Sequence, residues 1–229
     1  MSKNILITGC SSGLGYALTT LYLNKGYKVY GISRTNPNIE NKNFIFKKVD
    51  LNKTSKIKDS LQSYLTNINE FELIYLNAGM LGEIKTLEEL SLDEMKEVFE
   101  LNVFANKELL DILKNCRVKN VIAISSGAAI NGSKGWASYS LSKAGLNMLI
   151  NLYSKEMENT KLLAVAPGVI ETPMTDYIRF DIDEEIFTSA KKLKTGHIQK
   201  PYEAACRLSN LLENSKKYES GSFIDVRNI

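Results

Sequence analysis

The segment TGCSSGLG, residues 8–15, directly follows the apolar run NILIT and leads into the helix-like segment LGYALTTLYLNKG. Its glycines are Gly9, Gly13 and Gly15. A phosphate group needs a tight turn, a backbone that it can approach without a Cβ in the way, and a helix N-terminus with free N–H groups. A glycine motif alone is weak evidence, but a strand before it and a helix after it are the context that dinucleotide binding requires. The segment therefore predicts a β-α-β unit that binds a dinucleotide.

Short runs rich in β-branched residues recur along the chain, with helix-length segments between most of them. The runs cover residues 4–8, 27–33, 43–49, 71–76, 120–125, 162–166 and 222–226. One helix-length segment, residues 91–115, begins with Ser91 and Glu94 at the spacing of a capping box. Mostly unbroken apolar strands that alternate with helices indicate a parallel sheet covered on both faces. We therefore expect an α/β fold with a doubly wound, Rossmann-type parallel sheet of about seven strands.

The chain has 229 residues, of which 44% are hydrophobic and 24% are charged, as in ordinary globular proteins. It shows no internal repeat, low-complexity segment or Pro/Gly-rich linker, so we expect a single domain over residues 1–229. The segment 174–200, between the sixth and seventh runs, is too long for a tight connection. We interpret it as a mobile substrate lid over an apolar pocket, to which Tyr177, Phe180 and Phe187 contribute. The alternative is an ordered surface excursion.

Charge and cysteine usage exclude several function classes. The 29 basic and 26 acidic residues give a net charge of +3 without a block of like charges, so we expect no nucleic acid partner. Cys10, Cys116 and Cys206 lie far apart and form neither a CxxC pair nor a Cys/His cluster, which argues against a disulfide framework and against a metal site. No apolar stretch approaches the ~18 residues of a membrane span, and we find no export signal. A cytoplasmic protein that binds neither metal nor membrane is expected.

Seven short sequence motifs and single residues follow one another along the chain. They are TGCSSGLG at 8–15, Asp50-Leu51 after the third strand, LNAG at 76–79, Asn102 in ELNVFAN, Ser126 in AISSG, YSLSK at 139–143 and APGVIET at 166–172. In these motifs and residues the chain resembles the short-chain dehydrogenase/reductase family in its compact single-domain form, over nearly its whole length. Longer sugar epimerase-type relatives space their glycines differently and carry an added substrate domain. Family members often end near the last strand with Asp-Gly-Gly, where this chain reads IDVRNI.

The resemblance implies a role for each matching residue. Asn102, Ser126, Tyr139 and Lys143 match the catalytic tetrad of the family. The residues that it assigns to the cofactor are Gly9, Ser11, Ser12, Gly13, Leu14, Gly15, Asp50, Leu51, Asn77, Ala78, Gly79, Tyr139, Lys143, Pro167, Gly168, Val169 and Thr172. Within this set Asp50 would reach the adenine and Thr172 would lie near the nicotinamide amide. A homodimer or homotetramer is also implied by the resemblance.

Reduction of a ketone requires a hydride and a proton, and a nicotinamide cofactor carries only the hydride. Tyr139 and Lys143 are spaced to share one helical face, and a nearby cation favours the phenolate of a tyrosine whose ordinary pKa is near ~10. Ser126, at the end of a strand, could hold the substrate oxygen. Asn102 in mid-helix could distort the helix and order water for a relay to Lys143, a step that depends mainly on the resemblance. Taken alone, the tyrosine and lysine would be an ordinary surface pair.

We expect the cofactor to be NADP(H) rather than NAD(H). An acidic residue about 20 positions beyond the glycine loop usually binds the ribose 2′-hydroxyl of NAD and repels a 2′-phosphate. The chain instead reads GISRTNP there, with Ser33 and Arg34 and no carboxylate before Glu40. Arg34 can donate a charged fork to the phosphate, and Ser33 a hydroxyl. The alternative is that Arg34 is an ordinary solvated arginine. One feature argues against NADP(H): many NADP-preferring relatives carry a basic residue just before the middle glycine, where this chain has Ser12.

The sequence thus predicts an oxidoreductase that transfers hydride between NADP(H) and a small-molecule carbonyl or secondary alcohol. Two alternatives remain: a catalytically silent dinucleotide-binding sensor, disfavoured by the intact Ser126, Tyr139 and Lys143, and a sugar-nucleotide epimerase or dehydratase, disfavoured by length and glycine spacing. His197 receives no role, and Trp136 is either a core residue or a wall of the pocket.

Overall fold

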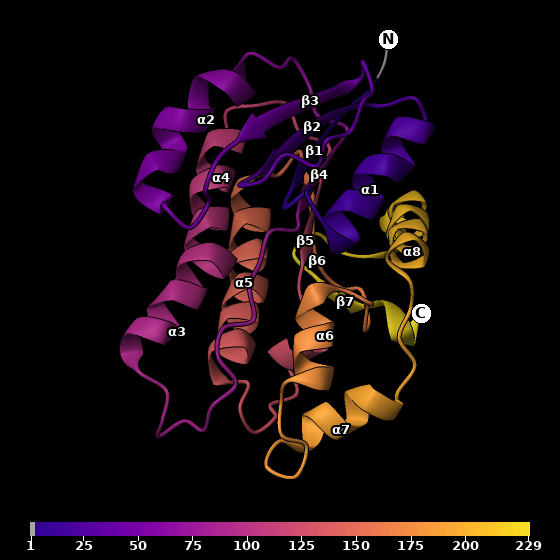
Figure 1. Ribbon diagram of the computed structural model, residues 1–229. Coiled ribbons are helices and arrows are strands. Elements are labelled where there is room, and N and C mark those ends of the chain that lie inside the picture. The colour runs from indigo at the N-terminus through magenta and orange to yellow at the C-terminus, as the bar shows by residue number, and fades with distance from the viewer. Residues whose placement is uncertain (1–2) are drawn as a thin grey trace.

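A seven-stranded sheet in the order β3-β2-β1-β4-β5-β6-β7 organises the computed structural model, which describes residues 3–229 (Figure 1). Its strands are β1 (Asn4–Thr8), β2 (Lys28–Ser33), β3 (Phe44–Lys48), β4 (Leu73–Leu76), β5 (Asn120–Ile124), β6 (Lys161–Ala166) and β7 (Phe223–Asp225). All neighbouring strands pair in parallel. The prediction of a doubly wound parallel sheet is confirmed. The strand order reverses between β1 and β4, which is where such sheets bind ligands.

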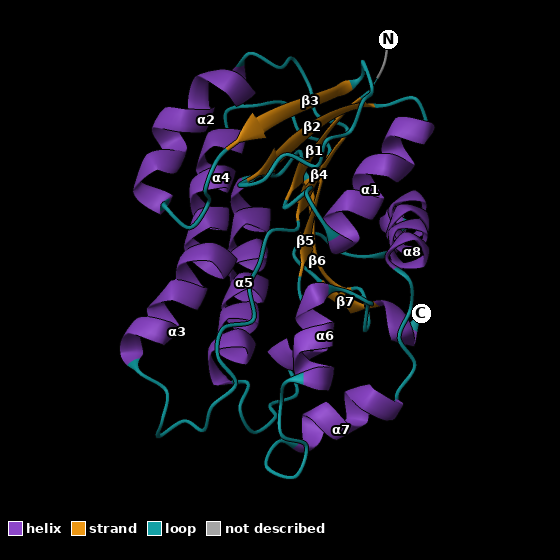
Figure 2. Cartoon of the chain, viewed as in Figure 1, coloured by secondary structure: helices purple, strands orange, loops and turns teal. Residues whose placement is uncertain are grey.

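Helices cover both faces of the sheet (Figures 1 and 2). One face carries α2 (Ile57–Thr66), α4 (Ala105–Leu113) and α5 (Ala137–Glu156), and the other carries α1 (Gly13–Asn24) and α8 (Pro201–Glu213). The remaining helices are α3 (Leu92–Phe99), α6 (Pro173–Phe180) and α7 (Thr188–Thr195). Short 3₁₀ turns cover Thr54–Lys56, Gly127–Ala129, Ser215–Lys217 and Val226–Asn228.

The side chains of β1 explain why its sequence is apolar without a break. Ile5 and Ile7 pack under α1 and α8, whereas Leu6 points to the opposite face under α2 and α4, and all three are fully buried. Successive residues of a strand point to opposite faces, so a strand covered on both sides needs an apolar residue at every position. The same reasoning holds for β4 and β5.

The segment 91–115 is less regular than its periodicity suggests. Ser91 Oγ accepts a hydrogen bond from Glu94 N at 3.2 Å, and Glu94 Oε2 accepts one from Ser91 N at 2.9 Å, which confirms the capping box at the start of α3. A π-helical turn over Glu100–Phe104 then separates α3 from α4. The distortion expected at Asn102 is therefore present, and π turns often occur at functional sites.

The connection between β6 and β7 holds helices rather than an open loop. Thr172 caps α6 by accepting a hydrogen bond from Thr175 N, and Pro173 occupies the first helical position. An isolated parallel bridge joins Ile170 to Gln199 and closes the excursion at its base. Figure 1 shows α6 and α7 together beyond the carboxyl ends of β5 and β6. None of the helices in residues 3–229 is both long and apolar enough to cross a membrane.

Candidate active site

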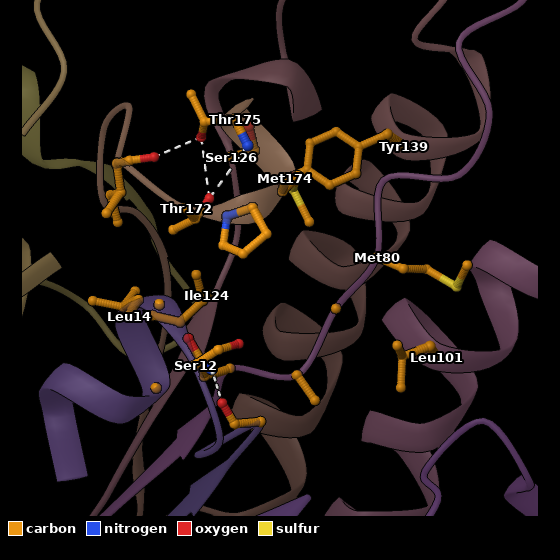
Figure 3. A pocket seen from close by; sticks show the side chains of 18 of the residues that line it. Ser12, Leu14, Met80, Leu101, Ile124, Ser126, Tyr139, Thr172, Met174 and Thr175 are labelled. Atoms are coloured by element: carbon orange, nitrogen blue, oxygen red, sulfur yellow. Dashed lines mark hydrogen bonds between the residues drawn. The ribbon is translucent and has the colours of Figure 1, made fainter. Parts of the chain in front are cut away.

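A cavity of about 490 Å³ opens at the carboxyl ends of the strands, beside the point where their order reverses. All predicted cofactor-binding residues line it, as do Ser126, Tyr139 and Lys143. Figure 3 shows side chains from four regions around this cavity: Ser12 and Leu14 of the glycine loop, Met80 after β4, Tyr139 of α5, and Met174 and Thr175 of α6. The sheet therefore brings the two groups of predicted residues together, although they lie far apart in the sequence.

The glycine loop has no room for side chains at two of its positions. A Cβ on Gly15 would lie 2.0 Å from Gly9 O, and a Cβ on Gly9 would lie 2.9 Å from Asn77 Nδ2. Gly9 and Gly13 also have φ angles of +68° and +51°, which glycine adopts at low cost. Asn77 Nδ2 donates to Thr8 O at 2.9 Å, so the residue after β4 holds the loop in place.

The same loop presents an anion site at the start of α1. Ser12 caps this helix with an extended backbone, its side chain makes no capping hydrogen bond, and no acidic residue lies in the first turn. The first N–H groups of a helix that are left without a side-chain cap can bind a phosphate. The loop therefore fits the diphosphate of a dinucleotide, both in its shape and in its donors.

The end of β2 carries the residues predicted to select the cofactor. Ser33 is buried, and its Oγ donates to Thr35 O at 2.6 Å. Arg34 is exposed, and no ion pair in the described part of the chain involves it. Both residues line the cavity, together with Asp50. Asp50 Oδ1 accepts a hydrogen bond from Asn52 N at 3.1 Å.

Tyr139 and Lys143 lie one turn apart on α5. The Lys143 ammonium is 5.6 Å from the centre of the Tyr139 ring, and it donates a hydrogen bond to Ile124 O at 2.7 Å. Burial lowers the pKa of Lys143 to about 8. Burial also raises the pKa of Tyr139, and a hydrogen bond with Ser126 opposes this shift. Burial is thus the larger influence on the pKa of the phenol, and the hydrogen bond with Ser126 counteracts it only in part.

Asn102 does not line the cavity, unlike the other three residues of the expected tetrad. Its side chain is fully buried: Oδ1 accepts from Met80 N at 2.9 Å, and Nδ2 donates to Met80 O and to Ser142 Oγ, each at 2.9 Å. Its carbonyl accepts a hydrogen bond from Asn106 Nδ2 at 2.9 Å. Because each polar group of Asn102 has a protein partner, this residue links the loop after β4 to α5 behind the cavity.

Several lining residues were not identified from the sequence. Met174 and Ile178 reach the cavity because Thr172 and Pro173 start α6 directly after the last cofactor motif. This pair is a recognisable helix start, so it was the signal that could have found them. The other residues of this kind are Thr35, Val49, Asn52, Met80, Glu97, Leu101, Ile124, Ser125, Ile170, Pro173, Thr175 and Leu193.

Trp136 is one of the cavity walls, which decides between the two interpretations left open by the sequence. The aromatic residues of the excursion take different positions. Phe187 is buried and Tyr177 packs against the same apolar cluster, whereas Phe180 is 71% exposed. None of the three lines the cavity, so the expectation that they contribute to the pocket is wrong. Phe180 ends α6 on its outer side, under the guanidinium of Arg179 at 4.9 Å.

Titratable groups that could bind a metal do not gather in this region. In residues 3–229, no group of three or more His, Cys, Asp or Glu side chains is close enough to hold a metal ion. His197, to which the sequence assigned no role, is exposed.

The sequence and the structure are both similar to known proteins over most of the chain. The family model described as short chain dehydrogenase matches residues 3–183. The chain is 34% identical to a benzil reductase ((S)-benzoin forming) of Bacillus subtilis, over 97% of both chains. It is 29% identical to a 3-oxoacyl-acyl-carrier-protein reductase of Thermotoga maritima, over 98% of this chain and 96% of the relative. A crystal structure of a short chain dehydrogenase/reductase from Saccharomyces cerevisiae superposes with a TM-score of 0.85 at 23% identity, covering 98% of this chain and 96% of that one.

Proposed function

Because the chain belongs to the short-chain dehydrogenase family of oxidoreductases, we propose that it reduces an uncharged carbonyl compound with NADPH and that Tyr139 donates the proton. The family binds nicotinamide dinucleotides and acts on small molecules. One observation carries the proposal: Ser126, Tyr139 and Lys143 line the same cavity into which the glycine loop opens. The proposed catalytic groups and the anion site therefore share one cavity.

A bound nicotinamide dinucleotide would supply the hydride, and the chain must supply the proton. The residues that would hold the dinucleotide are those of the glycine loop, Asp50, the segment Asn77–Gly79 and Thr172, all of which line the cavity. The tight contacts at Gly9 and Gly15 and the uncapped start of α1 support this assignment. Lys143, which is held to Ile124 O, adds positive charge beneath this part of the cavity.

Tyr139 carries its proton at neutral pH, as a general acid must, although burial raises its pKa and so opposes release of that proton. Ser126 lines the cavity together with Tyr139 and opposes the rise in the pKa of the phenol, so its hydroxyl can also donate to the carbonyl oxygen of a substrate. When the proton leaves, the positive charge of Lys143 at 5.6 Å from the ring stabilises the phenolate that remains. Asn102 contributes by holding the loop after β4 against α5.

The preference for NADPH over NADH rests on Arg34 and Ser33. The end of β2 carries no carboxylate that would repel a 2′-phosphate, and the exposed guanidinium of Arg34 forms no ion pair with another side chain in residues 3–229. A charge-assisted hydrogen bond of ~1.5–3 kcal/mol corresponds to about 10- to 150-fold in affinity. Since the cofactor end of the cavity otherwise offers few cations, Arg34 is the main source of this preference.

The proposed substrate is uncharged because the walls beside Tyr139 are apolar. Trp136, Met174, Ile178 and Leu193 form them. The benzil reductase of Bacillus subtilis, at 34% identity, supports a carbonyl compound of this kind. A homodimer or homotetramer and a cytoplasmic location remain predictions.

The direct test is NADPH consumption by the purified protein with benzil as substrate. We expect NADPH absorbance to fall only when benzil is present. Tight binding of NADPH without turnover of any compound in a carbonyl panel would instead indicate the silent sensor. An epimerised sugar nucleotide formed without net consumption of cofactor would indicate the epimerase alternative.

A further inference from the structure

Trp136 lies three positions before Tyr139 in the sequence and next to it in space. The two rings meet at an interplanar angle of 71°, and their centres are 5.9 Å apart. A carbonyl compound that accepts a hydrogen bond from the Tyr139 hydroxyl is therefore within reach of the indole. Since Trp136 lines the cavity, it is in a position to contact that substituent directly.

The indole is held in place by the excursion between β6 and β7. Trp136 Nε1 donates a hydrogen bond to Ser189 Oγ, in the first turn of α7, at 2.7 Å. Because an indole has a single N–H donor, this bond distinguishes between the two flipped orientations of the ring. Ser189 does not line the cavity, so it acts on a substrate through the indole.

A second contact fixes α7 next to the same loop. Phe187 packs on Gly135, where a Cβ would lie 2.6 Å from Phe187 Cδ1, and the Lys134 ammonium lies 5.8 Å from the centre of the Phe187 ring. Ala190 is fully buried one turn later. The hydroxyl of Ser189 is thus presented to Trp136 by a helix that is itself anchored to the residues before α5.

The part of the cavity wall that α6 and α7 contribute carries no charge. The described residues that α6 and α7 contribute to the lining are Pro173, Met174, Thr175, Ile178 and Leu193. Leu81, Ile84 and Phe187 pack behind them in the same apolar cluster. A flat apolar group would be buried between these side chains and the indole, whereas a carboxylate or ammonium there would lose its hydration without gaining a partner.

We propose that Trp136 is the specificity-determining residue of this cavity, that it selects carbonyl compounds with an aromatic ring next to the carbonyl group, and that Ser189 is the positioning residue that fixes the indole. The selection of a carbonyl compound rests on the proposed function. The fixing of the ring by Ser189 rests only on the hydrogen bond and the packing of α7.

The proposal is tested with benzil and with diacetyl, a diketone without aromatic rings. Steady-state kinetics with NADPH are measured for the unmodified protein, Ser189→Ala, Trp136→Phe and the double variant. A neutral hydrogen bond contributes about 2- to 12-fold, so Ser189→Ala should lower kcat/KM for benzil by that factor, mainly through KM. For diacetyl the change should stay below about twofold, because diacetyl has no ring to place against the indole.

Trp136→Phe keeps an aromatic ring but removes the N–H donor, so it should lower kcat/KM for benzil at least as much as Ser189→Ala does. Adding Ser189→Ala to it should then change nothing further, since both variants remove the same bond. Thr195→Val is the matched control, because the hydroxyl of Thr195 also lies on α7 but donates to Lys191 O of its own helix. Thr195→Val should leave kcat/KM unchanged for both substrates.

Trp136 is the only tryptophan, so its fluorescence reports on this wall without any turnover. Benzil should quench the emission with oxidised cofactor present, and Ser189→Ala should weaken that binding by a similar factor. If benzil quenches the emission but no carbonyl is reduced, the proposed function fails while the specificity proposal stands. Three results would each overturn the specificity proposal. The first is a ratio of kcat/KM for benzil to kcat/KM for diacetyl that Ser189→Ala leaves unchanged. The others are an effect of Ser189→Ala that persists in the Trp136→Phe background and an emission that benzil does not quench.

Discussion

Asn102 Nδ2 donates a hydrogen bond to Ser142 Oγ across 2.9 Å, and this bond joins the π-helical turn to the helix that carries Tyr139 and Lys143. The same amide also bonds both backbone groups of Met80. Gly79 lies between Asn102 and Lys143, since a Cβ at this position would be 3.1 Å from Asn102 Oδ1 and 3.3 Å from Lys143 Nζ. One buried amide therefore sets the distance between the loop after β4 and the lysine.

Asn102→Ala should destabilise the protein, because it removes the side-chain partner of both backbone groups of Met80 and the hydrogen bond that the Ser142 hydroxyl accepts. At about 1 kcal/mol for each hydrogen bond, the free energy of unfolding should fall by roughly 2–4 kcal/mol. Urea unfolding measures this quantity. Asn115→Ala is the control, since the Asn115 side chain donates only to Asp111 O at the exposed end of α4, and the change should cost under about 1 kcal/mol. If Asn102→Ala were inactive but fully stable, Asn102 would act in proton transfer instead.

Tyr139→Phe should abolish turnover and leave the affinity for the cofactor nearly unchanged, because it removes only the proton donor. Loss of general acid catalysis should lower kcat by about 10²–10⁴. Tyr202→Phe, which removes a hydroxyl from the exposed face of α8, should keep full activity. A Tyr139→Phe variant with more than about half of the original rate would show that Tyr139 and Lys143 are an ordinary helix pair.

NADPH should bind at least about tenfold more tightly than NADH, because only the 2′-phosphate can use the charge of Arg34. Titration calorimetry of both cofactors measures the ratio. Arg34→Ala should remove most of it and leave the affinity for NADH nearly unchanged. Arg117→Ala, at an exposed site that does not line this cavity, controls for the loss of one positive charge. Equal affinities for the two cofactors in the unmodified protein would contradict the assignment.

Hydrogen exchange should slow in residues 174–200 when cofactor and a substrate analogue bind. The prediction follows from the position of this segment: Met174, Ile178 and Leu193 line the cavity, so a ligand would contact both α6 and α7. Ligand contacts stabilise the closed arrangement and reduce local opening. The helix α2, which packs on the far side of the sheet core, serves as the internal reference. Equal protection with and without ligand would make the segment an ordered surface excursion and not a lid.

The sequence predicts the sheet and the cavity well because both follow from local patterns. The unbroken apolar runs such as Ile5–Ile7 need burial on two faces, and the glycine loop can follow only a strand in this geometry. The distortion at Asn102 was also foreseen from a residue that weakens helices. These features depend on neighbours in the sequence or on the order of strands.

The errors and omissions concern contacts between distant segments. Phe180 was expected in the pocket, but the direction of a side chain on α6 depends on how that helix docks, which its own sequence does not determine. The partner of Trp136 is Ser189, which is distant in the sequence and lies on a helix that packs beside Trp136, with Phe187 against Gly135. The dominant effect on the pKa of Tyr139 is burial by the surrounding elements, and neither composition nor motif spacing reveals that burial.

Lys143 should make stability depend on pH in a way that Lys143→Met removes. Burial lowers its pKa from the usual 10.5 to about 8 in the folded chain. Between these values the unfolded chain binds more protons than the folded one, so this residue makes the free energy of unfolding rise with pH over that window. From about pH 7 to about pH 9.5 the rise due to Lys143 should be about 2 kcal/mol.

Other lysines have pKa values raised by ion pairs, Lys119 and Lys200 among them, and they act in the opposite direction, mainly at a pH above this window. The informative quantity is therefore the difference between Lys143→Met and the unmodified protein, measured by urea unfolding at both pH values. Because the methionine carries no buried charge, its advantage in stability should be about 2 kcal/mol larger at the lower pH. Lys155→Met, an exposed change on the same helix, should show no such difference. Parallel pH dependences for Lys143→Met and the unmodified protein would mean that Lys143 keeps an ordinary pKa, and the charge beneath Tyr139 would then persist well above pH 8.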